Sequence, residues 1–352
     1  MKQRRRLVLA YPGDLCTRTG GYIYDRRLAL ELEARGWDVD RLSLPPSFPF
    51  PAEADLDHVG HRLASIPTGT TVLVDGLALG AMPAIAAAAA RRVDLVGLVH
   101  HPLCLETGLD PVRAAALAES ERAALAAARA VIVTSRATAA ALVKLMDVPA
   151  ERIAIAVPGT DPSPVARGST NGKVRMLSVG TVTPRKGHEV LVRALVRVHG
   201  PWKLIIAGSL DRDPATAERL RKTILAAGTV DRIQLLGELS ETALGELYDQ
   251  ADLFVSASFH EGYGMAIAEA LARGLPVVAA SGGAVADTVP ADAGLLVASG
   301  DAAALGSALQ RFLSDPGLAD RLRQGASTAR KGLPRWADTA ACVERAILRI
   351  AA

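Results

Sequence analysis

Two glutamates eight positions apart form the densest chemical signal in the sequence. Glu261 lies in a tight turn shaped by Gly262 and Gly264, directly after an expected strand, and Glu269 lies inside the helix expected to follow. The residues around Glu269 are nearly all apolar, so its carboxylate is expected to be mostly buried and to need a partner, since an unpaired buried charge is costly. The vicinal hydroxyls of a sugar would provide that partner through two hydrogen bonds, and an arginine would provide it through an internal ion pair.

A second signal is a pair of cations, Arg185 and Lys186, on a loop that starts at Gly180 and ends at Gly187. The loop joins an expected strand to an expected helix. A guanidinium and an ammonium at the N-terminus of a helix form a cradle for an anion such as phosphate, because the helix dipole adds to their charge. The alternative is an exposed pair of cations on a turn.

Three features of the first half of the chain also fall where strands are expected to end. Gly20 and Gly21 open a helix, which lets backbone N–H groups approach a phosphate, but the loop matches neither Gly-x-Gly-x-x-Gly nor a P-loop. His100 and His101 follow a later strand, at the edge where parallel sheets bind ligands. Glu106 lies just beyond them. The alternatives are a histidine satisfied by loop backbone and a solvated loop glutamate.

Alternating short apolar runs and helical stretches must position these residues, and they predict an α/β protein with parallel sheets. In the first half, strands are expected at Leu7–Ala10, Val39–Leu44, Thr70–Val74, Val93–Val99, Ala130–Val133 and Ile153–Val157. In the second half, they are expected at Val174–Val179, Trp202–Ala207, Ile233–Leu236, Leu253–Ser256, Pro276–Ala279 and Gly294–Val297. Several runs lack polar alternation, as expected when helices cover both faces of a sheet.

The stretch from Pro158 to Lys173 consists of turn residues without apolar periodicity and is the best linker candidate. We therefore expect two Rossmann-like domains, with a ligand cleft between the carboxyl ends of their sheets. The expected division is 1–160 for the first domain, 161–173 for the linker, 174–334 for the second domain and 335–352 for a last helix.

Composition excludes several other classes of protein. The 40 basic and 37 acidic residues give a net charge of +3, which is too small to predict nucleic-acid binding. The three cysteines lie far apart and indicate neither a disulfide framework nor a zinc site. Asp-x-Asp occurs at 38–40, at 55–57 in a stretch expected to be helix or loop, and at 211–213, which is close to chance, so no metal site is expected.

The sequence also bears on membrane contact. The longest uncharged stretch, 76–90, is too short to span a bilayer, and the N-terminal apolar run is too short for a signal peptide. The expected compartment is therefore the cytoplasm. The basic segment Arg4–Arg6 leaves peripheral contact with an anionic inner membrane face as a hypothesis.

Taken together, these motifs resemble the retaining glycosyltransferases of family 4, which have the GT-B architecture. The segment from Glu261 to Glu269 resembles the family's E-x7-E element, and the loop 179–187 resembles its phosphate-binding loop. The segments 273–279 and 293–297 are similar to its later helix-to-strand turn and strand. The chain departs from the family in the loop 281–288, which lacks the usual Pro-Glu pair.

The resemblance implies a role for each site residue. Glu261 would bind hydroxyls of the donor sugar, Glu269 the ribose, and Arg185 with Lys186 the diphosphate. His100 or His101 would contact the sugar and the charge developing at its anomeric carbon. The implied catalytic residues are His100, Arg185, Lys186 and Glu261. The implied donor-binding residues are Gly21, Gly180, Thr181, Arg185, Lys186, Glu261, Gly262, Tyr263, Gly264, Met265 and Glu269. The acceptor candidates are His101 and Glu106.

The implied activity is transfer of a hexose from a nucleotide-diphosphate sugar, of the UDP or GDP type, with the anomeric configuration retained and without a further cofactor. The family's usual same-face route has the leaving phosphate take the acceptor's proton. The acceptor, whether glycan, lipid-linked or small molecule, is left open, and so is the oligomeric state. The resemblance also implies that the last helix packs back on the first domain. The alternatives are a non-catalytic nucleotide-sugar-binding regulator and a GT-B nucleotide-sugar epimerase or phosphorylase.

Overall fold

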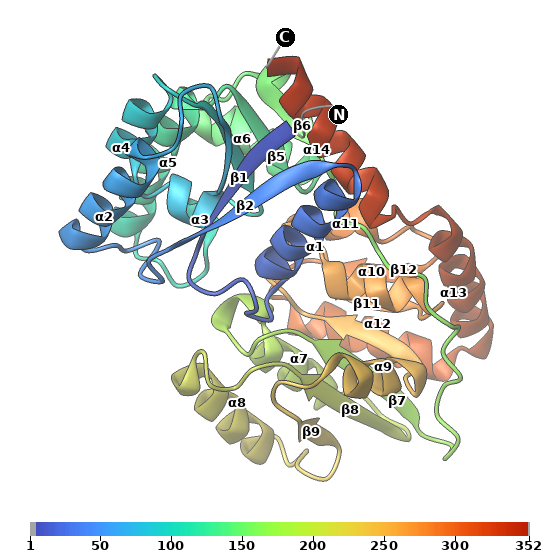
Figure 1. Cartoon of the computed structure of the whole chain (residues 1–352). Helices are drawn as coiled ribbons and strands as arrows, with labels where there is room; N and C mark the ends of the chain where they lie inside the picture. Colours follow the sequence, from blue (N-terminus) through green and yellow to red (C-terminus); the bar gives the residue numbers. More distant parts are fainter. Residues whose placement is uncertain (1–4, 351–352) are drawn as a thin grey trace. The chain divides into compact units, whose positions relative to one another are not determined.

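The computed structural model describes residues 5–350, which divide into two compact units. The first unit runs to Gly159 and takes up the chain again from Pro334, and the second unit holds Thr160–Leu333. In Figure 1, helices surround a sheet in each of them. Each unit therefore has its own sheet and its own hydrophobic core.

The sheet of the first unit has six parallel strands in the order β2-β1-β3-β4-β5-β6. The strands are β1 (Arg5–Pro12), β2 (Trp37–Leu44), β3 (Thr71–Asp75), β4 (Asp94–Val99), β5 (Ala130–Val133) and β6 (Ile153–Ile155). The helices are α1 (Gly20–Ala34), α2 (Glu53–Ala64), α3 (Gly76–Leu79), α4 (Pro83–Ala89), α5 (Pro111–Ala127), α6 (Arg136–Met146) and α14 (Trp336–Ile350), with 3-10 turns η1 (Leu103–Leu105) and η2 (Ala150–Arg152).

The sheet of the second unit also has six parallel strands, in the order β12-β11-β10-β7-β8-β9. The strands are β7 (Val174–Val179), β8 (Trp202–Ala207), β9 (Ile233–Leu235), β10 (Leu253–Ser256), β11 (Val277–Ala280) and β12 (Gly294–Val297). The helices are α7 (His188–Leu195), α8 (Pro214–Ala226), α9 (Glu241–Asp249), α10 (Met265–Ala272), α11 (Val285–Thr288), α12 (Ala302–Ser314) and α13 (Pro316–Ala329), with 3-10 turns η3 (Pro184–Lys186) and η4 (Arg330–Gly332).

In both sheets the strands that follow the first strand in the chain are placed first on one side of it and then on the other. In the first unit the chain passes from β1 to β2 on one side and then adds β3 on the other side of β1. In the second unit β8 and β9 lie on one side of β7, and β10 lies on the other. At such a switch point the loops leave adjacent strands in opposite directions, which opens a crevice at the carboxyl ends of the strands. Each unit therefore has one position where its topology favours a ligand.

The strands are buried on both faces, which explains their apolar composition. In β10, Leu253 and Val255 belong to one hydrophobic cluster and Phe254 belongs to another. Neighbouring side chains of a strand point to opposite faces, so a core lies on each side of the sheet. All twelve strands predicted from apolar runs are confirmed, with bounds that shift by a few residues at most.

Helix α2 is the main element that the sequence pattern left open between helix and loop. Its buried stripe is narrow, with Val59 and Leu63 as its buried residues, and the residue before it is Ala52 instead of a usual capping residue. Asp55 supplies the cap from inside the helix, because its Oδ2 accepts the N–H of Ala52 at 3.1 Å and the hydroxyl of Ser47 at 2.7 Å.

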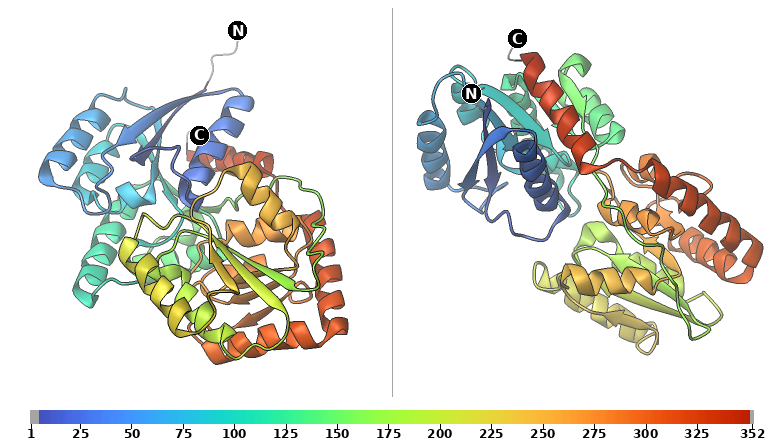
Figure 2. Two further views of the ribbon diagram at one scale, coloured as in Figure 1. Left: turned by 90° about the horizontal axis from the view of Figure 1, so that it is seen from below. Right: turned by 45° about the vertical axis from the view of Figure 1, so that its right-hand side comes forward.

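Helix α14 packs against α1, β5 and β6 of the first unit. The Trp336 ring lies edge-on to Tyr24 at 5.7 Å, and the Thr339 hydroxyl donates to the carbonyl of Val157 at 2.7 Å. The dark red helix stays beside this unit in both views of Figure 2. The last helix therefore contributes to the core of the first unit.

The basic N-terminal segment is only partly described, since Arg4 lies outside the described residues. Arg6 Nε donates to Asp40 Oδ2 at 2.7 Å, and Arg5 lies 3.6 Å from a Glu344 carboxylate oxygen. Both described arginines thus have acidic partners within the first unit. Among residues 5–350, no helix combines the length and the hydrophobicity that a membrane span requires.

Candidate functional site

Glu261 is the centre of the candidate site in the second unit. It follows β10 and is 9% exposed. Its Oε1 accepts from Lys186 Nζ at 2.6 Å and from the Ser258 hydroxyl at 2.6 Å, and its Oε2 lies 3.6 Å from an Arg185 guanidinium nitrogen. The structure therefore brings together the glutamate and both cations that the sequence singled out on two different loops.

Charge decides the protonation state of Glu261. Burial alone would raise its pKa, but Lys186 and Arg185, together with the hydrogen bonds from Lys186 and Ser258, lower the pKa to about 2. The carboxylate is therefore ionised at any physiological pH and acts as a hydrogen-bond acceptor.

The loop after β11 fixes the backbone of Glu261. Glu261 N–H donates to the carbonyl of Gly282 at 3.2 Å, and Ala284 N–H donates to the carbonyl of Glu261 at 2.8 Å. Gly283 has φ +67°, and a Cβ there would lie 2.2 Å from the Glu261 carbonyl oxygen. Only glycine fits this contact. The loop that departs from the family pattern thus holds the glutamate in place.

The loop that carries the two cations is tied to the loop after β10. Arg185 donates from its guanidinium to the carbonyl of His260 at 2.8 Å, and its own carbonyl accepts from Phe259 N–H at 2.8 Å. Gly187, at φ +63°, approaches Ala257 so closely that a Cβ would lie 2.2 Å from its carbonyl oxygen. Two loops that leave adjacent strands are therefore locked together at the switch point.

Gly180 and Thr181 begin the same loop. A Cβ on Gly180 would lie 3.0 Å from Cε of Lys186, so the missing side chain leaves room for the lysine stem. Thr181 is half-buried in the next position.

His188 was missed as a site residue, although it directly follows the cationic loop. It is 4% exposed, and its Nδ1 has no hydrogen-bond partner among the described residues. Burial first, and then the charge of Lys186, lowers its pKa to about 4. The ring is therefore neutral, which keeps a third positive charge away from Glu261.

Glu269 lies half-buried in α10, with Tyr248 as its partner. The Tyr248 hydroxyl lies 3.0 Å from Glu269 Oε2, and Arg273 lies over the Tyr248 ring and donates to the backbone carbonyl of Glu269 at 3.1 Å. Burial raises the pKa of Glu269. Within the described residues its carboxylate has a hydrogen bond from a neutral tyrosine and no ion pair with an arginine. No sequence pattern indicated Tyr248, which lies on a different helix, α9.

The turn 262–265 leads into α10. Gly264 has φ +92° and caps the helix, and Met265 is its first residue. The Tyr263 carbonyl accepts the Thr288 hydroxyl at 2.6 Å, and burial raises the pKa of Tyr263 to about 12. Gly262 is half-buried in this turn. The first backbone N–H groups of α10 thus follow Glu261 after a short turn.

In the first unit, His100 directly follows β4 and contacts two carboxylates. Its Nε2 lies 2.9 Å from Asp25 Oδ1 and 3.5 Å from Asp75 Oδ2. The ring is edge-on to Tyr24, and a Cβ on Gly21 would lie 3.3 Å from His100 Cδ2. The structure thus brings Gly21 and His100 together at the switch point of this unit. Both aspartates were missed, because they lie far from His100 in the sequence.

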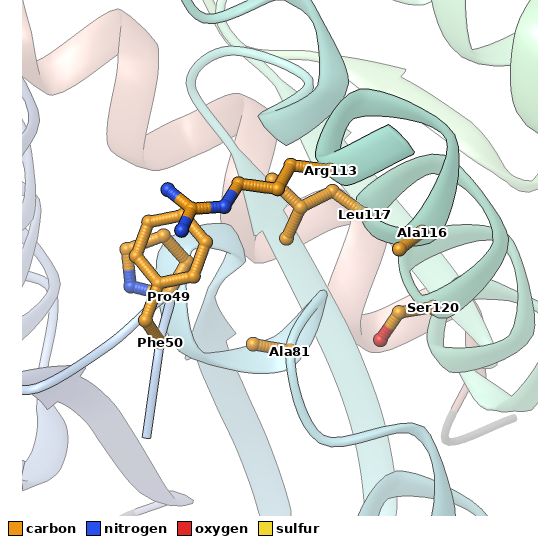
Figure 3. Close-up of a pocket in the computed structure, with 7 residues that line it drawn as sticks. All are labelled: Pro49, Phe50, Ala81, Arg113, Ala116, Leu117 and Ser120. Atoms are coloured by element: carbon orange, nitrogen blue, oxygen red, sulfur yellow. The ribbon is translucent and has the colours of Figure 1, made fainter. Parts of the chain in front are cut away.

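His101 and Glu106, the acceptor candidates, lie near each other, with 3.9 Å between Nε2 and Oε2. The Glu106 side chain is 46% exposed and that of His101 is 18% exposed. Figure 3 shows a separate cavity of about 590 Å³ in the same unit, and neither residue lines it. The lining residues are Pro49, Phe50, Ala81, Arg113, Ala116, Leu117 and Ser120. This cavity is mostly apolar, with one cation.

One group in the described part of the chain has the spacing of metal ligands: Asp25, Asp75 and His100, whose ligand atoms lie within 4.8 Å of one another. Nε2 of His100 and Oδ1 of Asp25 are in direct hydrogen-bond contact at 2.9 Å, and this contact accounts for their positions without an ion. In the Asp-x-Asp segments, Asp40 pairs with Arg6, and Asp213 accepts the N–H of Thr216 at 2.9 Å at the start of α8. Asp55, as described above, caps α2.

Two family models match the chain, Glycosyl transferases group 1 over residues 162–329 and Glycosyltransferase Family 4 over residues 72–164. A 2-deoxystreptamine N-acetyl-D-glucosaminyltransferase from Streptomyces fradiae is 30% identical, over 92% of this chain and 88% of that protein. A lipopolysaccharide core biosynthesis mannosyltransferase from Rhizobium leguminosarum bv. viciae is 34% identical, over 40% of this chain and 41% of that protein. A D-inositol 3-phosphate glycosyltransferase from Xylanimonas cellulosilytica is 30% identical, over 63% of this chain and 57% of that protein. The chain therefore spans about half the length of the last two relatives.

Solved structures match over nearly the whole chain. A sucrose-phosphate synthase from Thermosynechococcus elongatus has a TM-score of 0.84 at 23% identity and covers 98% of this chain and 99% of its own. Anabaena HepE, in complex with UDP and glucose, has a TM-score of 0.75 at 18% identity and covers 97% of this chain and 99% of its own. These likenesses confirm the GT-B fold. The family models and the Streptomyces fradiae relative show that the chain belongs to family 4 of the glycosyltransferases.

Proposed function

We propose that this protein transfers a sugar from a nucleotide-diphosphate donor to an acceptor, with the anomeric configuration retained. The observation that carries the proposal is the ionised, buried Glu261 facing Lys186 and Arg185 at the switch point of the second unit. A carboxylate beside two cations matches a ligand that presents sugar hydroxyls next to a diphosphate. Family membership supports the same activity.

The diphosphate is the leaving group in this reaction, and its charge is what the protein must stabilise. Arg185 and Lys186 would neutralise the developing charge, with help from the first N–H groups of α10. The bond from the anomeric carbon to the leaving oxygen breaks, and the bond to the acceptor oxygen forms on the same face. The leaving phosphate takes the acceptor's proton. Glu261 would bind sugar hydroxyls and take no proton.

Glu269 would bind the ribose hydroxyls of a UDP or GDP type donor. Tyr248 contacts its Oε2, which leaves Oε1 for a ligand. In the first unit, His100 would contact the donor sugar, with Gly21 allowing close approach beside it.

For the acceptor we propose the first unit. His101 and Glu106 offer polar contacts there, and the cavity beside Phe50 offers an apolar lining with one cation at Arg113. The relatives named as lipopolysaccharide core and 2-deoxystreptamine transferases support a saccharide or amino-cyclitol acceptor in glycan or small-molecule biosynthesis.

The test is nucleotide release from a panel of UDP and GDP sugars, with and without candidate acceptors. Wild type should release nucleotide from at least one donor, and Glu261→Ala should lose that release while its circular dichroism spectrum is unchanged. Glu218→Gln, an exposed glutamate on α8 in the same unit, is the control and should behave as wild type.

Three outcomes would contradict the proposal. Full activity in Glu261→Ala would exclude the assigned site. Tight binding of nucleotide sugar without release from any donor would favour the regulator. Conversion of the donor to another nucleotide sugar would favour the epimerase.

A further inference from the structure

His100 is held by carboxylates from two different elements of the first unit. Asp25 lies on α1 and is 0% exposed, and Asp75 ends β3 beside β4, which His100 follows. Both carboxylates approach the same ring nitrogen, Nε2. Two buried carboxylates beside one nitrogen are costly unless the ring carries a positive charge or one acid keeps its proton. Burial and Asp75 raise the pKa of Asp25 to about 7, and His100 opposes this rise.

Each aspartate has a hydrogen-bonding pattern that fits this role. Asp75 uses Oδ1 to accept the N–H of Leu77 at 2.6 Å, so its Oδ2 is directed to His100. Asp25 uses Oδ1 for His100, and its buried Oδ2 has no hydrogen-bond partner in the described part of the chain. Asp25 lies inside α1 and not at its cap, and burying its carboxylate costs free energy of desolvation.

The Nδ1 atom of His100 makes no hydrogen bond within residues 5–350. The side chain is 21% exposed, so this edge of the ring is reachable by a ligand. With Nε2–H donated to the aspartates, a protonated ring presents Nδ1–H, a donor. A neutral ring with the same Nε2–H would present a lone pair, an acceptor.

We propose that Asp25 and Asp75 are positioning residues that hold His100 as an imidazolium, so that Nδ1–H donates to an oxygen of the donor sugar or its diphosphate and the ring cannot serve as a base. This rests on the proposed function for the identity of the ligand. The charged state itself rests on the first unit alone.

The charges around the ring agree with this assignment. Burial would lower the pKa of His100, but Asp25 and Asp75 raise it above its ordinary value. The other titratable group against the ring is Tyr24, whose hydroxyl donates to the carbonyl of Ala156 at 2.8 Å and whose pKa burial raises further. Thr134 of the segment after β5 contacts the His100 carbonyl and carries no charge. Tyr24 is therefore neutral over the working range, and the two aspartates control the ring.

The experiment measures the titration of His100 directly, by NMR of protein labelled with 15N-histidine. His100→Gln assigns the signal among the seven histidines. Wild type should stay protonated above pH about 8, and Asp25→Asn should lower the His100 pKa by about 1–3 units. If Asp25→Asn does not fold, Asp75→Asn is used, since its side-chain oxygen still accepts from Leu77. Asp94→Asn, which removes an aspartate paired with Arg129 at the start of β4, is the control and should leave the signal unchanged.

Turnover gives the second measurement. In Asp25→Asn, kcat should fall about tenfold or more as the pH rises through the lowered pKa and recover below it, with a smaller change in KM. Wild type should show no such step. An ordinary His100 pKa in wild type, or identical titrations in wild type and Asp25→Asn, would overturn the inference. Failure of every donor to react would instead contradict the proposed function and leave the NMR result standing.

Discussion

At the residue scale, Lys186 has two tasks in one position. It donates to the buried Glu261 and keeps that carboxylate ionised, and it would bind the diphosphate of a donor. The first task is visible without ligand, because the ammonium and carboxylate are already 2.6 Å apart. A bound diphosphate must therefore share Lys186 with Glu261 or take the place of Glu261. Because Glu261 would bind the sugar, recognition of the diphosphate and recognition of the sugar are coupled.

Lys186→Met is expected to lower kcat/KM for the donor by about 10²–10³-fold, because it removes one of the charges that stabilise the leaving group. It should also destabilise the second unit, because Glu261 keeps its buried charge and loses its main cation. Steady-state kinetics and chemical denaturation measure the two effects. Lys222→Met, an exposed lysine on α8, is the control and should change neither. Wild-type kinetics in Lys186→Met would exclude the lysine from the site.

Tyr248→Phe is expected to raise KM for the donor by about 2–10-fold with little change in kcat, since it removes one hydrogen bond to Glu269. Isothermal titration with the free nucleotide should show a similar loss. An unchanged nucleotide affinity would mean that Glu269 does not bind the nucleotide.

The sequence predicted some of these residues and missed others for a physical reason. Glu261 and Glu269 share one turn and helix, and Arg185 and Lys186 share one loop, so their spacing singled them out as candidates. Their partners lie elsewhere in the chain. Asp25 is separated from His100 by 75 positions and Tyr248 from Glu269 by 21, so only the fold makes them neighbours.

At the element scale, the second-unit site is made by three loops that leave the adjacent strands β7, β10 and β11. Close backbone contacts hold these loops together. The loop after β11 forms hydrogen bonds with both the backbone N–H and the backbone carbonyl of Glu261. Gly187 packs against the loop after β10. These contacts hold the loops together in the absence of a ligand, which favours preorganised electrostatic stabilisation.

Gly283→Ala should disturb this arrangement, because its Cβ would meet the Glu261 carbonyl at 2.2 Å and its φ is +67°. We expect a loss of about 1–3 kcal/mol of stability and a fall in activity. Gly245→Ala, at an open position inside α9, is the matched control and should stabilise the protein slightly through helix propensity. Equal effects of the two substitutions would contradict the role of the loop contact. Differential scanning calorimetry and donor turnover test both.

At the scale of the whole molecule, the fold was largely predictable because each strand is a short apolar run flanked by turn residues. Twelve such runs gave twelve strands, and the helical stretches between them predicted that the strands are parallel. The order of the strands within each sheet came from the structure. Helix α2 was not predictable to the same degree, since its buried stripe is narrow and its cap comes from Asp55 instead of the preceding residue.

The first unit also contains a buried acid that should make its stability depend on pH. Glu121 on α5 is 0% exposed, its Oε2 accepts the N–H of Leu103 at 2.9 Å, and burial raises its pKa to about 8. The folded state then keeps a proton that the unfolded state loses at its ordinary pKa. The contribution of Glu121 to the free energy of unfolding is greatest below the ordinary pKa of a glutamate. It falls as the pH rises towards about 8, by at most about 1.4 kcal/mol per pH unit.

Glu121→Gln should remove this dependence while keeping an oxygen for Leu103. Urea denaturation at about pH 5 and about pH 8 should show a smaller loss of stability for the variant than for wild type. Glu119→Gln, two residues earlier on α5, is the control and should follow wild type. Parallel pH dependence in wild type and Glu121→Gln would exclude the buried acid as the cause.

The most direct test of the central claim is the configuration of the sugar that leaves the donor. Real-time 1H NMR of turnover with an α-linked nucleotide sugar, with an acceptor or with water in its place, distinguishes the first-formed anomer before mutarotation. The account predicts an α-linked product or α-sugar first, at a rate that Glu261→Ala abolishes. Formation of the β-anomer first, or the same turnover in Glu261→Ala, would contradict it.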